Sequence, residues 1–225
     1  MGTVNNLEII TACQFSQLHL LPAFVEALQK HTCFPFLLRI IVAASVADVE
    51  TVGEMNAQLQ AAFPPPPPAP PKERPTLQNR ERSRLQVTTT TKEAGYNLLV
   101  HDTLKESDST YVLILPVSHL LQDKEWFGKM QLPLLQDRTC GLVGVIGNGE
   151  WNTRPPVKLL YDDKRSGTAC LLPKSIHGMM VTFDPMGDDY VQQLSFAVRR
   201  CGMSAWVALS VRMLIVGETV TDDVG

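Results

Sequence analysis

The chain has 225 residues, 44% of them hydrophobic, and its 20 Lys and Arg against 23 Asp and Glu give a formal net charge of −3. This length allows one large domain or two small ones, and the charge balance argues against a nucleic-acid-binding protein because it supplies no basic field for a phosphate backbone. Five cysteines without a CxxC pair argue against both a disulfide scaffold and a zinc site.

Apolar runs and helical repeats alternate over the first 62 residues. Short aliphatic runs at residues 7–12 and 36–44 predict buried strands. Apolar residues recur at helical spacing over 18–29, and residues 46–62 have helical composition. This β-α-β-α order predicts an α/β domain with a mostly parallel central sheet that is covered by helices on both faces.

A proline-rich segment at residues 63–84 interrupts this alternation. It contains five consecutive prolines at 64–68 and two more at 70 and 71. Because each proline ring fixes φ and removes a hydrogen-bond donor, we expect polyproline II conformation. We interpret the segment as a solvated insert or linker, with a docking segment for a proline-reading partner as the alternative. The expected division is a first half of one domain at 1–62, the insert at 63–84 and the second half at 85–225.

Regular elements resume after the insert. Runs of aliphatic and β-branched residues predict strands, helical spacing predicts helices, and residues 151–166 are too polar and irregular for either. The glycines of Gly147-Asn148-Gly149 predict a turn. Strands are expected at 87–91, 111–115, 140–146, 175–183 and, as one or two segments, 205–216. Helices are expected at 95–106 and 189–200, and an amphipathic segment at 126–135.

No stretch reaches the roughly 18 uninterrupted apolar residues of a membrane span, since Arg212 interrupts the strongest candidate and Ser118-His119 interrupts another. The first residues contain Glu8 and no basic lead, so we expect no secretory signal peptide. We therefore expect a protein of the cytoplasm, or of a particle assembled there.

Four blocks of residues stand in an informative order and spacing. They are residues 9–28; residues 39–48; Gly95-Tyr96-Asn97 through Tyr111-Val112-Leu113-Ile114-Leu115 to Asp123-Lys124-Glu125-Trp126 and Gly141-Leu142-Val143-Gly144; and Arg199-Arg200-Cys201-Gly202-Met203 followed by Gly217-Glu218-Thr219. In this order they resemble the motifs of family 2 of the nucleotide-sugar-dependent glycosyltransferases. The third block is the most similar to that family's motifs, and the resemblance covers most of the chain outside the proline tract. It implies a GT-A fold, which is Rossmann-like.

The departures from the family fall on residues that bind the donor. In the family, an acid in the turn after the second strand holds the nucleotide base, and Ala43 and Ala44 stand in that place here. The family's D-x-D carboxylates hold a divalent cation, and the matching positions here include Val117 and Ser118. Hard cations need oxygen ligands, which an apolar side chain cannot supply. The adjacent His119 is interpreted as a structural or surface residue rather than as a replacement ligand. The nucleotide-binding position is therefore degenerate.

The third functional element of the family is an acid at the start of the last helix, which takes the proton of the acceptor hydroxyl in inverting members. Asp188 and Asp189 lie near that point, but matching either one to the family requires a local shift of register. A helix N-terminus also explains both residues, because carboxylates there cap free amides and oppose the helix macrodipole.

The irregular stretch after residue 150 contains further candidates. Trp151 is the tryptophan best suited to stack on a ligand or partner, and Arg154 is a second candidate contact. If the site lacked a cation, basic side chains could replace it. The available ones are Arg154, Lys158, Lys164 and Arg165.

These observations support two main hypotheses. The first is a degenerate glycosyltransferase-like domain without a cofactor, which acts as a structural or protein-interaction component of a larger assembly such as a viral particle, as a homo-oligomer or with a protein partner. The alternative is an active inverting glycosyltransferase that uses a nucleotide sugar, either with Mn²⁺ or Mg²⁺ or independently of metal, with Asp188 or Asp189 as the base. A third hypothesis is a sugar-binding module that keeps only the acceptor groove. The fold does not decide among them.

Overall fold

The computed structural model describes residues 6–63, 83–90, 95–145, 155–159, 167–179 and 181–216. The proline tract at 64–71, the turn at 147–149, Trp151 and Arg154 lie outside these ranges. The division of the chain at 1–62, 63–84 and 85–225 stays a prediction.

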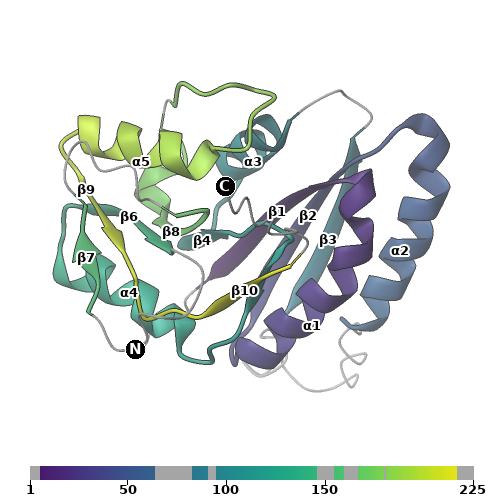
Figure 1. Ribbon diagram of the computed structural model, residues 1–225, viewed down its shortest axis with the longest axis horizontal. Coiled ribbons are helices and arrows are strands. Elements are labelled where there is room, and N and C mark those ends of the chain that lie inside the picture. Colours follow the sequence, from purple (N-terminus) through teal and green to yellow (C-terminus); the bar gives the residue numbers. More distant parts are fainter. Residues whose placement is uncertain are drawn as a thin grey trace, which may run out of the picture.

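An eight-stranded sheet forms the centre of the molecule, in the order β3-β2-β1-β4-β8-β6-β9-β7 (Figure 1). Its first half is parallel: β1 pairs with β2 and β4 on its two sides, and β3 pairs with β2. In the second half β8 runs antiparallel between β4 and β6, β9 is parallel to β6, and β7 is antiparallel to β9. The strands are β1 Leu7–Gln14, β2 Phe36–Ala43, β3 Arg84–Thr90, β4 Tyr111–Ile114, β6 Cys140–Val145, β7 Val157–Lys158, β8 Ala169–Pro173 and β9 Ser204–Val207. The expected mostly parallel α/β architecture is confirmed.

Helices cover both faces of the sheet (Figure 1). Alternation along β1 explains why both faces are apolar: Leu7 and Ile9 belong to one buried cluster, while Ile10 and Ala12 belong to the other. The first cluster includes residues of α1, α2 and α4, and the second includes residues of α3 and α5. The helices are α1 Leu21–His31, α2 Val49–Ala61, α3 Tyr96–Lys105, α4 Trp126–Gln136 and α5 Tyr190–Arg200. Among the described residues, none of the helices has both the length and the apolar character needed to cross a bilayer.

A small second sheet lies beside the main one. β5 (His119–Leu121) pairs antiparallel with β10 (Met213–Ile215), so His119 faces Ile215 in register. The range 205–216 therefore contains two strands in different sheets, separated by a turn at Leu209 and Ser210.

The strand expected at 175–183 is wrong. The chain instead forms a 3-10 turn at Lys174–Ile176, and the amide of Met179 donates to the Ile176 carbonyl at 2.9 Å. The preceding run Ala169–Pro173, which sequence patterns did not identify, pairs with β4 on one side and β6 on the other. Because β8 occupies the position between β4 and β6, these two strands offer no free edge to the residues that follow β8. A second expectation is also wrong: the range 151–166 was expected to contain neither helix nor strand, but Val157–Lys158 forms the short edge strand β7 because it finds β9 as a pairing partner. β3 begins at Arg84, inside the range expected for the insert.

A buried ion pair connects the first two strands to the end of α3. Glu8 on β1 is only 1% exposed, and its Oε1 lies 2.8 Å from Nε of Arg39 on β2. Its Oε2 accepts hydrogen bonds from the hydroxyls of Ser107, at 2.6 Å, and Ser109, at 3.1 Å. Removing one partner of a buried pair leaves the other charge uncompensated, which destabilises the fold more strongly than loss of a surface pair.

We expect Glu8→Ala to lower the free energy of unfolding by about 3 kcal/mol, because it removes the buried partner of the Arg39 guanidinium, which then retains a 3.4 Å contact with the exposed Glu106, and the acceptor of the Ser107 and Ser109 hydroxyls. Glu54→Ala, at an exposed position of α2, is the matched control and should change stability by less than about 0.5 kcal/mol. Urea unfolding followed by circular dichroism measures both. Equal effects of the two substitutions would contradict a stabilising role for the pair.

Candidate functional site

The parallel strands β1, β2 and β4 all end at one side of the sheet, which we call the carboxyl edge. Ligands of open α/β sheets bind at this edge, where the strand order changes direction. Ala43 is the last residue of β2, and the amide of Ala44 donates to the Thr90 carbonyl of β3 at 3.0 Å. Ala43 and Ala44 are 9% and 8% exposed. Their methyl groups are buried and offer no hydrogen-bond acceptor to a nucleotide base.

The turn after β4 does not fit a divalent cation. Val117 is 2% exposed and packs into the apolar cluster shared with α1 and α4. The Pro116 carbonyl accepts the amide of His119 at 2.9 Å, which closes the turn. Ser118 supplies one neutral hydroxyl, and that hydroxyl lies 3.0 Å from Nδ1 of His119. These groups provide no carboxylate at the position where the family resemblance implied two.

His119 is held between two hydroxyl groups. Its Nδ1 faces Ser118 Oγ at 3.0 Å, and its Nε2 faces Oγ1 of Thr168, just before β8, at 2.6 Å. The side chain is 4% exposed, and burial lowers the pKa of the imidazole to about 4. His119 is therefore neutral at pH 7 and has a hydroxyl group within hydrogen-bond distance of each ring nitrogen.

Asp188 and Asp189 lie at the start of α5, near the carboxyl edge. Asp188 is exposed, whereas Asp189 is partly buried and is the N-cap residue. The Asp189 carboxylate does not cap a backbone amide. It accepts hydrogen bonds from Nε2 of Gln193 at 2.7 Å and Nδ2 of Asn97 at 2.9 Å, and these two contacts lower its pKa. Asp189 is thus held as a carboxylate by two neighbouring amides.

Asn97 belongs to the Gly95-Tyr96-Asn97 motif, but the sequence did not predict the hydrogen bonds that its side chain makes. It is fully buried on α3, and its Nδ2 donates both to Asp189 and to the Asp184 carbonyl, at 2.8 Å. Its Oδ1 accepts the amide of Tyr190, at 2.8 Å, and its own amide donates to the Gly187 carbonyl. One side chain of α3 therefore caps α5 and shapes the segment before it.

An aromatic cluster extends from this contact between α3 and α5 into the core. Nδ1 of His101 on α3 lies 2.8 Å from the hydroxyl of Tyr190, and Phe183 packs edge-on against both rings. Burial raises the pKa of Tyr190 and lowers that of His101. Both side chains are accordingly neutral near pH 7, which suits a packed core.

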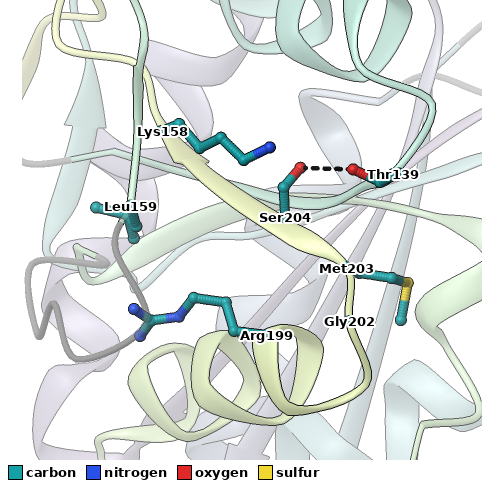
Figure 2. Close-up of a pocket in the computed structure, with 7 residues that line it drawn as sticks. All are labelled: Thr139, Lys158, Leu159, Arg199, Gly202, Met203 and Ser204. Atoms are coloured by element: carbon teal, nitrogen blue, oxygen red, sulfur yellow. Dashed lines mark hydrogen bonds between the residues drawn. The ribbon is translucent and has the colours of Figure 1, made fainter.

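A separate polar cleft of about 210 Å³ lies at the opposite edge of the sheet, where β6 and β9 begin (Figure 2). Lys158, one of the predicted cation substitutes, lies in this cleft and not at the carboxyl edge. Its Nζ lies 3.1 Å from Oδ2 of Asp137, which also accepts the Ser204 hydroxyl at 2.6 Å. Bonds from Ser204 and Thr139 hold the pKa of Asp137 well below its usual range. The residues that line the cleft are Thr139, Lys158, Leu159, Arg199, Gly202, Met203 and Ser204.

The structure brings some predicted site residues together and separates others. Ala43, Ala44 and His119 lie at the carboxyl edge, at the end of β2 and after β4. Asp188 and Asp189 lie near the same edge, at the start of α5. Within the described ranges, no three His, Cys, Asp or Glu side chains come together in a way that could hold a metal ion. Trp151, Arg154, Lys164 and Arg165 lie outside those ranges.

Comparisons with known proteins find no matching family model and no matching curated protein. Solved structures do match. A mannosyltransferase from Pyrobaculum calidifontis, in complex with GDP-Man and Mn²⁺, aligns with a TM-score of 0.68 and 10% identity over 96% of this chain and 58% of its own. S. aureus TarS residues 1–349, in complex with UDP, aligns with a TM-score of 0.59 and 10% identity over 93% of this chain and 60% of its own. A mycobacterial protein gives 0.61 and 9%, over 96% and 69%.

These likenesses show that the chain has the fold of the GT-A glycosyltransferases, as the sequence motifs predicted. Identities of 9–10% support the fold alone. The chain spans 58% of the mannosyltransferase structure and 60% of the TarS structure.

We expect Asn97→Ala to lower the free energy of unfolding by about 2–4 kcal/mol, because it leaves the Tyr190 amide and the Asp189 carboxylate without their buried partner. Gln58→Ala, at an exposed site on α2, should have almost no effect. Urea unfolding compares the two variants with the wild type. If Asn97→Ala changed the free energy of unfolding by less than about 0.5 kcal/mol, the contact of Asn97 with the start of α5 would not stabilise the fold.

We also expect His119 to make stability depend on pH. Its folded-state pKa of about 4 lies below the unfolded value of about 6.5, so the unfolded chain binds the extra proton first as the pH falls. The stability contributed by His119 is present above about pH 6.5 and is lost progressively toward pH 4, by roughly 3 kcal/mol. His119→Gln should remove this part of the profile, measured by urea unfolding from pH 7.5 to 4. An identical pH dependence in the variant would rule out a buried neutral imidazole.

Proposed function

We propose that this GT-A-like domain does not transfer sugar and acts as a structural or protein-interaction component of a larger assembly. The observation that carries the proposal is the turn after β4, where Val117 is buried in the core and His119 is engaged by Ser118 and Thr168. A diphosphate leaving group requires strong charge neutralisation, and these groups are neutral at pH 7.

Two further features of the carboxyl edge support the same proposal. The buried methyl groups of Ala43 and Ala44 cannot accept a hydrogen bond from a nucleotide base. The carboxylate of Asp189 is bonded to Asn97 and Gln193, and its lowered pKa makes it a weaker proton acceptor. The residues that build the fold are thus retained, while the positions expected to bind base, cation and acceptor proton carry other chemistry.

We expect calorimetric titration with UDP, GDP, CDP and TDP, each with and without Mn²⁺, to give no binding heat, because the turn after β4 supplies neither a carboxylate for a cation nor a cationic side chain for the diphosphate. Thermal unfolding with the same nucleotides is the second measurement and should show no stabilisation. Binding in the micromolar range that Mn²⁺ strengthens would overturn the proposal. Turnover of a nucleotide sugar, lost in Asp188→Asn or Asp189→Asn without unfolding, would establish the active alternative.

A further inference from the structure

The two end strands of the main sheet differ in how well they resist pairing with another chain. These strands are β3 and β7 (Figure 1). β7 is two residues long and contains Lys158. β3 extends over seven residues, and its single charged side chain is that of its first residue, Arg84. Short length and lysine keep an edge strand from pairing, and β3 has neither. β3 is therefore the edge of the sheet that can accept a further strand.

The register of β3 decides which of its backbone groups point away from β2. Thr90 stands opposite Ala43 in the parallel ladder, and its carbonyl accepts the amide of Ala44 at 3.0 Å. Thr90 therefore directs its backbone groups toward β2. Along a strand, successive residues direct these groups to alternate sides. The residues of β3 whose amides and carbonyls point outward are thus Leu85, Val87 and Thr89.

These outward groups are available to a partner strand. Among the described residues, Nε2 of Gln60 on α2 makes the one hydrogen bond to them, at 3.4 Å from the Leu85 carbonyl. Within the same part of the chain, the outward groups of Val87 and Thr89 have no protein partner. Because backbone amides and carbonyls need hydrogen bonds, they bind water unless another strand replaces it.

Apolar side chains of β3 would gain from the same pairing. Leu85 and Val87 pack against the first buried cluster but remain only partly buried, because the sheet ends at β3. A strand added beside β3 would cover their outer sides. Removing this apolar surface from water would add a favourable contribution to that of the backbone hydrogen bonds.

A second copy of the chain can satisfy this edge in one orientation. A twofold axis parallel to the strands would set each outward amide against the same amide of the other copy. A twofold axis perpendicular to the sheet makes the two β3 strands antiparallel, so that amides meet carbonyls. With Val87 on this axis, all seven residues of β3 lie opposite a residue of the other copy.

The side chains that face each other in this register are compatible. The strand contains a single charged residue, which meets a neutral one, so like charges do not oppose each other. β-branched and aliphatic side chains meet near the axis, and such cross-strand pairs stabilise antiparallel strands. The facing pairs are Val87 with Val87, Leu85 with Thr89, Gln86 with Thr88 and Arg84 with Thr90.

We propose that β3 pairs with β3 of a second copy of this chain in antiparallel orientation, centred on Val87, so that the two main sheets become one. The prolines at 64–68 are poorer partners for this edge, because proline has no backbone amide to donate to the β3 carbonyls. The proposal does not depend on whether the domain transfers sugar.

The edge of one strand is small compared with the roughly 1,200 Å² that stable interfaces bury, so the dimer should be weak and depend on concentration. Sedimentation velocity from about 1 µM to about 1 mM tests it. We expect the wild type to shift from monomer to dimer over this range. A protein that stays monomeric at the highest concentration would overturn the proposal.

Two substitutions of Thr89 separate backbone pairing from side-chain contact. The Thr89 amide points outward, so Thr89→Pro removes a hydrogen bond to the other copy but none to β2. It should raise the dimer dissociation constant at least about tenfold. Thr89→Ala keeps the amide and is the matched control, which should dimerise within about threefold of the wild type. Equal weakening by both substitutions would overturn pairing through the β3 backbone. Circular dichroism checks that both variants remain folded.

Hydrogen exchange of the wild-type chain tests the location of the interface without any substitution. At about 1 mM the amide of Val87 should exchange at least about threefold more slowly than at about 10 µM, because pairing protects it from water. The amide of Leu132, on α4, is the control and should exchange equally at both concentrations. A dimeric sample with an unchanged rate at Val87 would overturn the proposal.

Charges placed at Gln86 and Thr88 test the antiparallel register, in which these two residues of different copies face each other. Gln86→Lys combined with Thr88→Lys brings like charges together twice in each dimer. Gln86→Lys combined with Thr88→Glu brings opposite charges together at the same places. The second double variant should dimerise at least about tenfold more tightly than the first. Equal dimerisation of the two would show that the register centred on Val87 is wrong.

Discussion

The buried amide of Asn97 ties the two helices on one face of the sheet to each other. It bonds to the Asp184 carbonyl, the Asp189 carboxylate and the Tyr190 amide, and thereby holds the start of α5 against α3. Because the Asn97 side chain is buried, water cannot replace a lost hydrogen bond, and breaking any of these bonds would leave a buried polar group unsatisfied. The position of Asp189 at the carboxyl edge, and the packing of Tyr190 against His101, follow from this constraint.

The turn after β4, at the carboxyl edge of the sheet, is built from neutral groups. The fold places the ends of β1, β2 and β4 at the edge where open α/β sheets bind their ligands, and this arrangement depends on apolar packing beneath the strands. Here apolar packing extends into the edge itself, through Ala44 and Val117, and His119 is neutral and buried. The apolar packing that stabilises this turn therefore leaves it without a charged side chain.

Much of the architecture could be predicted from local patterns. The runs that became β1, β2, β4 and β6 are apolar on both faces, as expected for buried parallel strands, and the helices α3 and α5 follow helical spacing. β8 was missed and a strand was placed at 175–183 instead. Both apolar segments were short, and periodicity does not tell which of them reaches the sheet. Which segment becomes a strand depends on which one reaches the position between β4 and β6, and that position exists only in the assembled sheet.

The sequence by itself determined the α/β class, the GT-A resemblance and the absence of carboxylates from the turn after β4, because these follow from residue identity and spacing. Only the tertiary structure decided what the remaining side chains do. It joined Asn97 to Asp189 and His119 to Thr168, pairs separated by 92 and 49 positions. It also turned Leu132 and Leu135 toward solvent on a helix whose other face is buried. Hydrogen bonding and burial depend on distances in space, which the order of residues along the chain does not contain.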